Sequence, residues 1–464
     1  MDNQEDQKRP NIIWIFGDQH RAQALGCNGN KNVNTPNIDR MAENGINFKN
    51  AIAGFPLCCP FRGSLLTGKY PHDCVPGHEY RMPPSYPTIA TYLNANGYHT
   101  SYFGKWHVDG FHESNGRAAF HIVPPERRGD FKEWIGYENN NRQWDSWVHG
   151  GDGAETFHKK LPGYETDCLT DYLLDYLKGR EDKRDPFFSV LSVQPPHNPY
   201  YAPEENMERY YKDDYLLDPI DLDLRDNVPN VQRIKKQAAK DLAGYYAIIE
   251  NLDWNVGRIL DYLEESGLGD NTYVFFFSDH GDMHGSHGQF RKTTPYEESL
   301  RIPFIVGGGA LERSEISIDG SRTCDALINH VDIPCTTLGL AGIEVPESMR
   351  GHDYSRVITR STEQVISRSD EPDTAFIQSV IPTGHIHCVD KPWRGIVTKD
   401  GWKYACFNNC DWMMFNLNED PYELVNLAHN AEFKEKRHEL RKKLREWIVK
   451  TNDSFLVPIP CTYD

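Results

Sequence analysis

The sequence has no apolar run long enough to cross a bilayer, and it contains no low-complexity segment or internal repeat. Its first ten residues are polar and lack the apolar region of a secretory signal peptide. The 11 cysteines are an odd number without the spacing of a disulfide scaffold, which favours a reducing compartment. We therefore expect a cytoplasmic protein that does not insert into a membrane.

Basic residues are outnumbered by acidic ones. The chain has 50 Lys and Arg against 68 Asp and Glu, for a formal net charge of −18. This excess of acidic residues argues against nonspecific binding to nucleic acid or to an acidic membrane surface. It does not exclude an anionic substrate, because the local charge of a pocket matters more than the total. With 464 residues, 38% of them hydrophobic, the chain can form an enzyme core and a smaller domain.

The most informative motif is CCPFRGSLLTG at residues 58–68. Pro60 suits the first turn of a helix, where its missing N–H has no intrahelical partner to lose. Cys58 then lies at a helix N-terminus, where free N–H groups and the helix dipole favour an anion. Arg62 adds a fixed positive charge that can brace the nucleophile or a metal-ligand carboxylate. Taken alone, the motif is also compatible with two structural thiols beside a helix-starting proline.

Two apolar runs, NIIWIF at 11–16 and NTYVFFF at 271–277, are typical of buried strands. The residues that follow them include two polar pairs: Asp18, Gln19, Asp279 and His280. Ligands collect at the carboxyl ends of strands in open parallel sheets, so we expect the two pairs to converge on one metal ion. Each pair alone is also compatible with a turn held by an aspartate side chain.

Together these features resemble the signature of the type I sulfatases of the alkaline phosphatase superfamily. The resemblance rests on the C-x-P-x-R pattern with its L-T-G ending and on three further clusters. These are GKWH at 104–107, QPPHNP at 194–199, and QFRK at 289–292 followed by YEESLRIP at 296–303. The stretch DPYELVNL at 420–427 resembles part of the smaller C-terminal sulfatase domain, so the resemblance covers nearly the whole chain.

The resemblance implies a role for each matching residue. A formylglycine-generating enzyme would oxidise Cys58 to formylglycine, whose hydrated aldehyde attacks sulfur. Lys292 or His197 would help the alcohol leave, His107 would act as the base that lets sulfate depart, and Lys105 and Lys292 would clamp the sulfate oxygens. The implied catalytic residues are Cys58, Arg62, Lys105, His107, His197 and Lys292. The implied ligands of a single divalent metal are Asp18, Gln19, Cys58, Asp279 and His280.

The metal-ligand pattern departs from the commonest sulfatase pattern, which has Asp-Asp in the first pair and Asp-Asn in the second. Gln19 and His280 give a set that resembles the branch of choline sulfatases and phosphonate monoester hydrolases, which some glycan sulfatases share. One carboxylate fewer leaves the ion less neutralised, and an imidazole ligand tolerates Mn²⁺ or Zn²⁺ better than an all-oxygen site does. By resemblance, Ca²⁺ is the expected ion.

The expected activity is hydrolysis of a sulfate ester, with a glycosaminoglycan-type saccharide as the preferred substrate class. The alternatives are a phosphonate monoester or phosphodiester hydrolase with the same site, and an unmodified protein that only binds a sulfated sugar. Residues 111–167 interrupt the pattern as a long stretch rich in aromatic and charged residues. We interpret them as a substrate-binding insertion in which Trp144 or Trp147 could stack on sugar rings and Arg127 and Arg128 could meet a sugar carboxylate.

The predicted fold class is α/β. A large, doubly wound, mostly parallel sheet with helices on both faces is expected over residues 1–368. Within it, apolar residues at three- and four-residue steps between 242 and 263 predict a long amphipathic helix. Residues 369–464 are expected to form a smaller α+β domain. Its predicted parts are strands at 375–381 and 413–417, a hairpin over 393–407 and a closing amphipathic helix.

Overall fold

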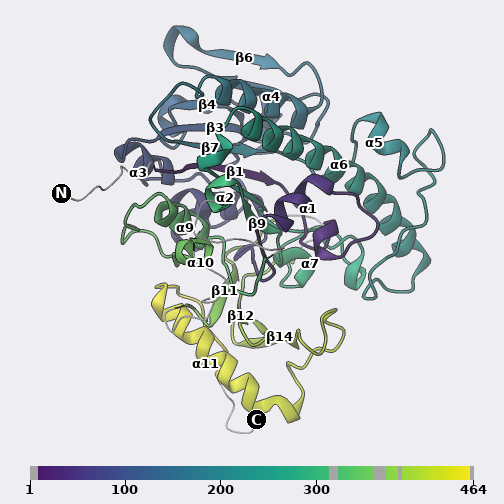
Figure 1. The fold of residues 1–464 in the computed structure, drawn as a ribbon. Coiled ribbons are helices and arrows are strands. Elements are labelled where there is room, and N and C mark those ends of the chain that lie inside the picture. Colours follow the sequence, from purple (N-terminus) through teal and green to yellow (C-terminus); the bar gives the residue numbers. More distant parts are fainter. Residues whose placement is uncertain (1–8, 313–321, 360–370, 385–388, 460–464) are drawn as a thin grey trace.

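A ten-stranded mixed sheet forms the centre of the larger part of the molecule (Figure 1). The computed structural model describes residues 9–312, 322–359, 371–384 and 389–459. The strands follow one another across the sheet in the order β10 (Arg322–Cys324), β2 (Ile46–Phe48), β9 (Phe304–Gly307), β8 (Thr272–Ser278), β1 (Asn11–Gly17), β7 (Phe187–Ser192), β3 (His99–Lys105), β4 (Glu133–Tyr137), β5 (Trp147–Gly150) and β6 (Phe157–Lys160). The five central strands from β8 to β4 are mutually parallel, whereas β9, β5 and β6 pair antiparallel with their neighbours.

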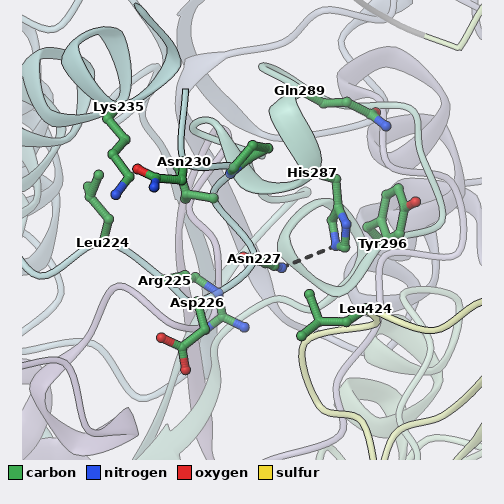
Figure 2. A pocket seen from close by; sticks show the side chains of 12 residues that line it. Leu224, Arg225, Asp226, Asn227, Asn230, Lys235, His287, Gln289, Tyr296 and Leu424 are labelled. Carbon is green, nitrogen blue, oxygen red and sulfur yellow. Dashed lines mark hydrogen bonds between the residues drawn. The ribbon is translucent and has the colours of Figure 1, made fainter. Parts of the chain in front are cut away.

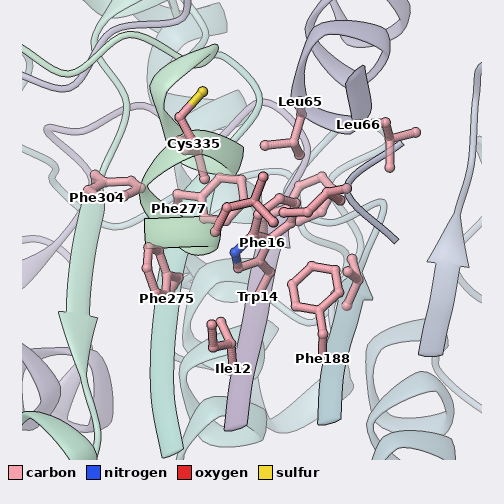
Figure 3. Close-up of a cluster of buried hydrophobic side chains, with 14 of the residues drawn as sticks. Ile12, Trp14, Phe16, Leu65, Leu66, Phe188, Phe275, Phe277, Phe304 and Cys335 are labelled. Carbon is pink, nitrogen blue, oxygen red and sulfur yellow. The ribbon is translucent and has the colours of Figure 1, made fainter. Parts of the chain in front are cut away.

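Helices cover both faces of this sheet, because its central strands are apolar on both sides. In β1, Ile12, Trp14 and Phe16 enter one core and Ile13 and Ile15 enter the other. Figure 3 shows the first core, where aromatic side chains of β1, β7 and β8 meet. That core is covered by α2 (Cys58–Thr67), α3 (Ile89–Ala95), α9 (Asp332–Leu340) and α10 (Ser355–Thr359). The second is covered by α1 (Pro36–Glu43), α4 (Glu165–Lys178), α5 (Glu204–Glu208) and α6 (Gln232–Glu265). The short helices α7 (Glu297–Leu300) and α8 (Gly309–Glu312) flank β9.

A second, four-stranded antiparallel sheet carries the C-terminal part of the chain. It consists of β11 (Thr374–Ser379), β12 (Trp393–Thr398), β13 (Trp402–Phe407) and β14 (Cys410–Asn416). One face packs on α11 (Lys434–Lys450) through Leu440, Leu444 and Trp447, and the other packs on the larger part of the molecule. The predicted fold class is therefore confirmed, including the hairpin and the closing helix. The expected boundary between 368 and 369 lies outside the described residues.

The predicted insertion at 111–167 is not an irregular stretch throughout, as the pattern had suggested. It contains β4, β5 and β6, which extend the main sheet at one edge, and it runs into the start of α4. Its aromatic content has a structural reason, because Trp134 is buried and packs edge-on against Trp106. Among the described residues no helix is both long and apolar enough to span a membrane.

A buried ion cluster joins the two parts of the molecule. Lys403 on β13 is fully buried, and its Nζ lies 2.6 Å from Glu423 Oε1, 2.6 Å from Glu297 Oε1 and 2.8 Å from the carbonyl oxygen of Pro295. Glu297 belongs to α7, so the lysine connects the small sheet to the segment that lies between β8 and β9 in the chain. The cluster fixes how the smaller sheet sits against the larger one.

Replacing Lys403 by methionine is expected to lower the free energy of unfolding by about 3–5 kcal/mol, because two buried carboxylates lose their shared countercharge. Lys442→Met, an exposed position on α11, serves as the matched control. Chemical denaturation of both variants measures the difference. A loss at Lys403 no larger than the control's would contradict this role.

Candidate active site

Cys58 is the first residue of α2, and its side chain is buried at the carboxyl ends of the central strands. Every residue of α2 is buried, and the helix ends at Gly68, whose φ of 66° suits glycine. The Cys58 Sγ lies 3.4 Å from Asp18 Oδ1, 3.2 Å from His280 Nε2 and 3.1 Å from Lys292 Nζ. Residues from three distant parts of the sequence therefore meet at this one thiol.

The side chains predicted to bind a metal form one compact cluster. One ligand atom each from Asp18, Cys58, Asp279 and His280 lies within 4.8 Å of the others. The backbone N–H of Gln19 donates to Asp279 Oδ1 at 3.0 Å, which places the fifth predicted ligand beside the same carboxylate. Asp18 and Gln19 follow β1 and Asp279 and His280 follow β8. These strands are neighbours in the sheet, which explains why the pairs meet.

The donor set fits a divalent cation. The amide nitrogen of Gln19 donates to Asp282 Oδ2 at 2.5 Å, while its Oε1 is buried with no hydrogen-bond partner. His280 Nδ1 lies 2.9 Å from the carbonyl oxygen of Gly281, which leaves Nε2 directed at the cluster. The Oδ2 atom of Asp279 is likewise buried without a hydrogen bond. Buried acceptors of this kind are stable when a cation satisfies them.

The charges of the cluster are unevenly balanced. Burial and the neighbouring Asp18 raise the pKa of Asp279 to about 6. Burial alone would raise the pKa of Asp18 as well, but Lys105, His197 and Lys292 hold it well below its usual range. For Lys292, burial favours the neutral form, yet the negative groups around it, Cys58 first, raise its pKa above the ordinary value. The lysine is therefore a cation at neutral pH, and Asp279 is the carboxylate most in need of a partner.

Two further cations stand around the carboxylates. Lys105 Nζ lies 2.6 Å from Asp18 Oδ2. The guanidinium of Arg62 lies 3.5 Å from Asp18 Oδ2 and 3.4 Å from Asp279 Oδ2, and it also donates to the carbonyl oxygen of Lys105 and to Ser192 Oγ. Arg62 therefore braces the predicted metal ligands from behind and does not contact the Cys58 thiol in this arrangement.

The two predicted catalytic histidines flank the site without touching Cys58. His107 follows Lys105 at the end of β3, and burial together with Lys105 and His78 lowers its pKa well below the ordinary value. His197 follows β7; burial and the cation of Lys292 likewise lower its pKa. His197 Nδ1 lies 2.7 Å from the carbonyl oxygen of Asn198, so its Nε2 is the atom available to a substrate. Both imidazoles are neutral at neutral pH.

Two residues that support the site were not predicted from the motifs. Asp282 holds the Gln19 amide and also accepts from Tyr200 Oη at 3.0 Å. Tyr245 on α6 accepts from the Arg21 backbone N–H and donates to the carbonyl oxygen of Gln19 at 2.8 Å. Asp282 belongs to the same D-H-G-D run as the metal ligands, which was an available signal. Tyr245 lies on the core stripe of its helix, and nothing local marks it.

The four insertion side chains singled out from the sequence have different surroundings. Trp144 is 51% exposed, whereas Trp147 is partly buried between Phe120 and His158. Arg127 pairs with Asp109 at 3.0 Å. Arg128 is buried over the ring of Trp134 and donates to the carbonyl oxygens of Val123 and Gly151. The expectation that Arg128 meets a sugar carboxylate is therefore wrong, because its donors already serve the fold.

Comparison with known proteins places this arrangement in a family. The sequence model of the family described as Sulfatase matches residues 10–343, and that of the N-sulphoglucosamine sulphohydrolase C-terminal domain matches 285–450. The chain belongs to the type I sulfatase family of the alkaline phosphatase superfamily and is a sulfuric ester hydrolase. The resemblance inferred from the motifs is thus confirmed at the level of the family, whereas the branch inferred from Gln19 and His280 stays a prediction.

Individual relatives agree with the family. An ulvan-active sulfatase of Formosa agariphila is 32% identical over 98% of this chain and 84% of its own length. An N-acetylglucosamine-6-O-sulfatase of Bacteroides thetaiotaomicron is 28% identical over 95% of this chain and 87% of its own. The structure of BT4656 with its substrate D-glucosamine-2-N,6-O-disulfate has a TM-score of 0.79 and 26% identity, and covers 96% of this chain and 99% of that chain.

Proposed function

We propose that this sulfatase hydrolyses a sulfate ester carried by a saccharide, with a formylglycine derived from Cys58 as nucleophile and one divalent cation. The observation that carries the proposal is the meeting of Cys58 with Asp18, His280 and Lys292 within 3.4 Å at a helix N-terminus. A thiol that only filled the core would not be surrounded by two predicted metal ligands and a cation. This proposal includes maturation by a formylglycine-generating enzyme.

Asp18, Gln19, Asp279 and His280 would hold the cation beside residue 58, with Ca²⁺ as the proposed ion. Formylglycine would supply a hydrated aldehyde as nucleophile, and the cation would supply positive charge next to it. Mn²⁺ or Zn²⁺ would also suit a set that contains an imidazole. The side-chain oxygen of Gln19 supports this assignment. The amide nitrogen donates to Asp282, and the buried Oε1 has no hydrogen-bond partner, so this oxygen is available to a cation.

The surrounding side chains can bind the sulfate group and move its protons. Lys105 and Lys292 place two cations at the site, where sulfate oxygens gain negative charge as the ester bond breaks. Lys292 retains its proton at neutral pH and can give it to the departing alcohol oxygen, as can His197 through Nε2 once it is protonated. The neutral imidazole of His107 suits a base.

Two cavities support a saccharide substrate. A cavity of about 790 Å³, shown in Figure 2, is lined by Lys235, Asn230, Gln289 and Arg225 together with an aromatic pair in which His287 stacks on Tyr296. Gln289 is three residues from Lys292, so this wall begins within about 11 Å of the lysine's Cα. Such a mixture of amides, cations and a ring suits a sugar that carries an anionic group.

A second cavity of about 900 Å³ lies beside the His197 loop and is lined by Trp144 and Tyr201. The Gln143 amide donates to the carbonyl oxygen of His197 at 2.9 Å, which ties the insertion to that loop. Trp144 and Tyr201 are 51% and 56% exposed, so both rings are open to a ligand in this cavity. This favours a contact with a sugar ring beyond the sulfated residue.

Turnover on sulfated glycosaminoglycan and ulvan oligosaccharides, an aryl sulfate and an aryl phosphonate tests the substrate class. We expect Trp144→Ala to lower kcat/KM on the best oligosaccharide by about 10-fold or more, from the loss of one stacking contact, with little change on the aryl sulfate. Trp254→Ala is the matched control, because Trp254 is 52% exposed on α6. Equal losses on both substrates would assign Trp144 to folding. Faster turnover of the phosphonate than of any sulfate would favour the alternative hydrolase activity.

A further inference from the structure

A second cluster of metal-binding side chains lies immediately beside the active site. It consists of Cys59, His78 and His107, which each offer one ligand atom within 4.8 Å of the others. Cys59 is fully buried and His107 is 3% exposed, whereas His78 is partly exposed. A thiol and two imidazoles prefer a soft or borderline cation such as Zn²⁺, and they suit Ca²⁺ poorly.

The spacing of these atoms matches a tetrahedral zinc site. The Cys59 Sγ and His78 Nδ1 atoms lie 3.7 Å apart. A zinc ion with Zn–S of about 2.3 Å and Zn–N of about 2.0–2.1 Å in tetrahedral geometry places sulfur and nitrogen about 3.6 Å apart. These two side chains therefore already stand at the separation that a shared ion requires.

Glu79 provides the outer contacts that protein metal sites use. Its Oε1 lies 3.6 Å from His78 Nε2, the ring nitrogen opposite the one that faces the thiol. The distance is that of an ion pair and is longer than a hydrogen bond. A carboxylate on this side of the ring, if it closes to hydrogen-bond distance, orients a metal-bound imidazole and increases its basicity. The Glu79 backbone N–H also donates to Cys59 Sγ at 3.4 Å, which stabilises negative charge on that sulfur. His112 Nδ1, at 2.9 Å from Glu79 Oε2, fixes the carboxylate in turn.

The third side chain, His107, is fixed by its surroundings but has a ring nitrogen without a hydrogen-bond partner. His107 Nδ1 is buried and has no hydrogen-bond partner. His107 and Glu79 both have left-handed backbone conformations, with φ of 56° and 58°. Such conformations are unfavourable for residues other than glycine, and they persist where the surrounding structure holds a functional group in position. The ring packs edge-on against His78, with ring centroids 5.5 Å apart.

We propose that Cys59, His78 and His107 form an inhibitory zinc site, distinct from the Asp18–His280 metal cluster. On binding, the Cys59 thiol releases its proton to solvent, and the ion is held by one sulfur and two nitrogens with a fourth position open to water. The ion withdraws His107 from proton transfer and places a divalent charge next to the substrate pocket. The zinc binding stands on its own geometry, and only the inhibition rests on the proposed sulfatase mechanism.

Zinc K-edge X-ray absorption of the full-length protein tests the site, with Ca²⁺ in excess and one equivalent of Zn²⁺ added. We expect one sulfur neighbour at about 2.3 Å together with nitrogen neighbours at about 2.0–2.1 Å. This sulfur signal should remain in Cys58→Ser and disappear in Cys59→Ser. Glu79→Gln should weaken zinc binding by roughly 10- to 100-fold, as expected for an outer partner, and His78→Ala should weaken it more. Cys74→Ser, which removes another buried thiol, is the matched control and should bind zinc as the wild type does.

Activity provides a second readout. Zinc should inhibit the wild-type enzyme reversibly, and Cys59→Ser should remain active and resist the inhibition. A zinc spectrum with oxygen and nitrogen neighbours only, or a sulfur signal that is lost in Cys58→Ser and kept in Cys59→Ser, would overturn the proposed site. If no sulfate ester is turned over under any condition, the proposed mechanism fails, while the absorption measurement still decides whether the zinc site exists.

Discussion

Replacing Cys58 by alanine is expected to lower sulfatase turnover by on the order of 10⁴-fold or more while the fold persists. The side chain at this position is the proposed covalent nucleophile, and no other group of the cluster can take its place. Asp18 and His280 are proposed ligands of the cation, and Lys292 is a protonated cation that lies 3.1 Å from the thiol. Steady-state kinetics on an aryl sulfate, with circular dichroism for the fold, measures the effect.

Cys59→Ala is the matched control for this variant, because Cys59 is the adjacent buried thiol of the same helix. Its loss of turnover should be far smaller, since its sulfur faces His78 and not the metal cluster. Mass spectrometry of the peptide that contains residue 58 should show an aldehyde in place of the thiol after coexpression with a formylglycine-generating enzyme. Full activity of protein that retains an unmodified thiol at this position would falsify the mechanism.

Removal of the metal is expected to have the second largest effect. Chelation, or Asp279→Ala, should reduce turnover by at least the roughly 10²- to 10³-fold that follows the loss of one preorganised electrostatic contact. Asp279 is the proposed ligand whose negative charge most needs a cation, because burial and Asp18 raise its pKa to about 6. Its Oδ1 also accepts the Gln19 backbone N–H, so its removal frees a second ligand.

The same variant should lose the effect of metal on stability, a readout that does not depend on turnover. A cation that binds only the folded state adds about 2.7 kcal/mol at a concentration 100 times its dissociation constant. Thermal unfolding of the wild type should therefore shift upward when Ca²⁺ is added to chelated protein, and that of Asp279→Ala should not. Asp253→Ala is the control: this buried carboxylate accepts the Asn37 and Ile38 backbone N–H groups at the start of α1. It should lower stability and retain the metal-dependent shift.

Much of the site could be predicted because the polar residues of the motifs follow strands that lie side by side in the sheet. Asp18 and Asp279 each follow a run of apolar residues that is typical of a buried strand, and parallel strands end at one edge. The position of Cys58 at the start of a helix likewise follows from Pro60 two residues later. These are local consequences of side-chain apolarity and of a missing backbone N–H, so the sequence alone contains them.

Other features depend on distances that no local pattern encodes. Residues 133–160 look irregular because their short strands carry few apolar positions. They join the sheet because β4 pairs with β3, β5 with β4 and β6 with β5. The sequence around Arg128 is typical of a charged surface turn, whereas in the structure its guanidinium lies over the ring of Trp134. In the same way, a cysteine at a variable motif position gave no reason to consider a second metal site.

The sequence by itself determined the family, the fold class and the identity of the residues around Cys58, because motif spacing and apolar periodicity are properties of the chain. Only the tertiary structure decided which nitrogen or oxygen of each side chain is free. The Oε1 of Gln19 is free because Asp282 takes its amide nitrogen, and Cys59 faces His78 because the loop after α2 returns to that helix. A buried polar atom forms a hydrogen bond with whichever partner the packed fold places within reach. These partners come from other segments of the chain, so the local sequence does not show which atom remains free.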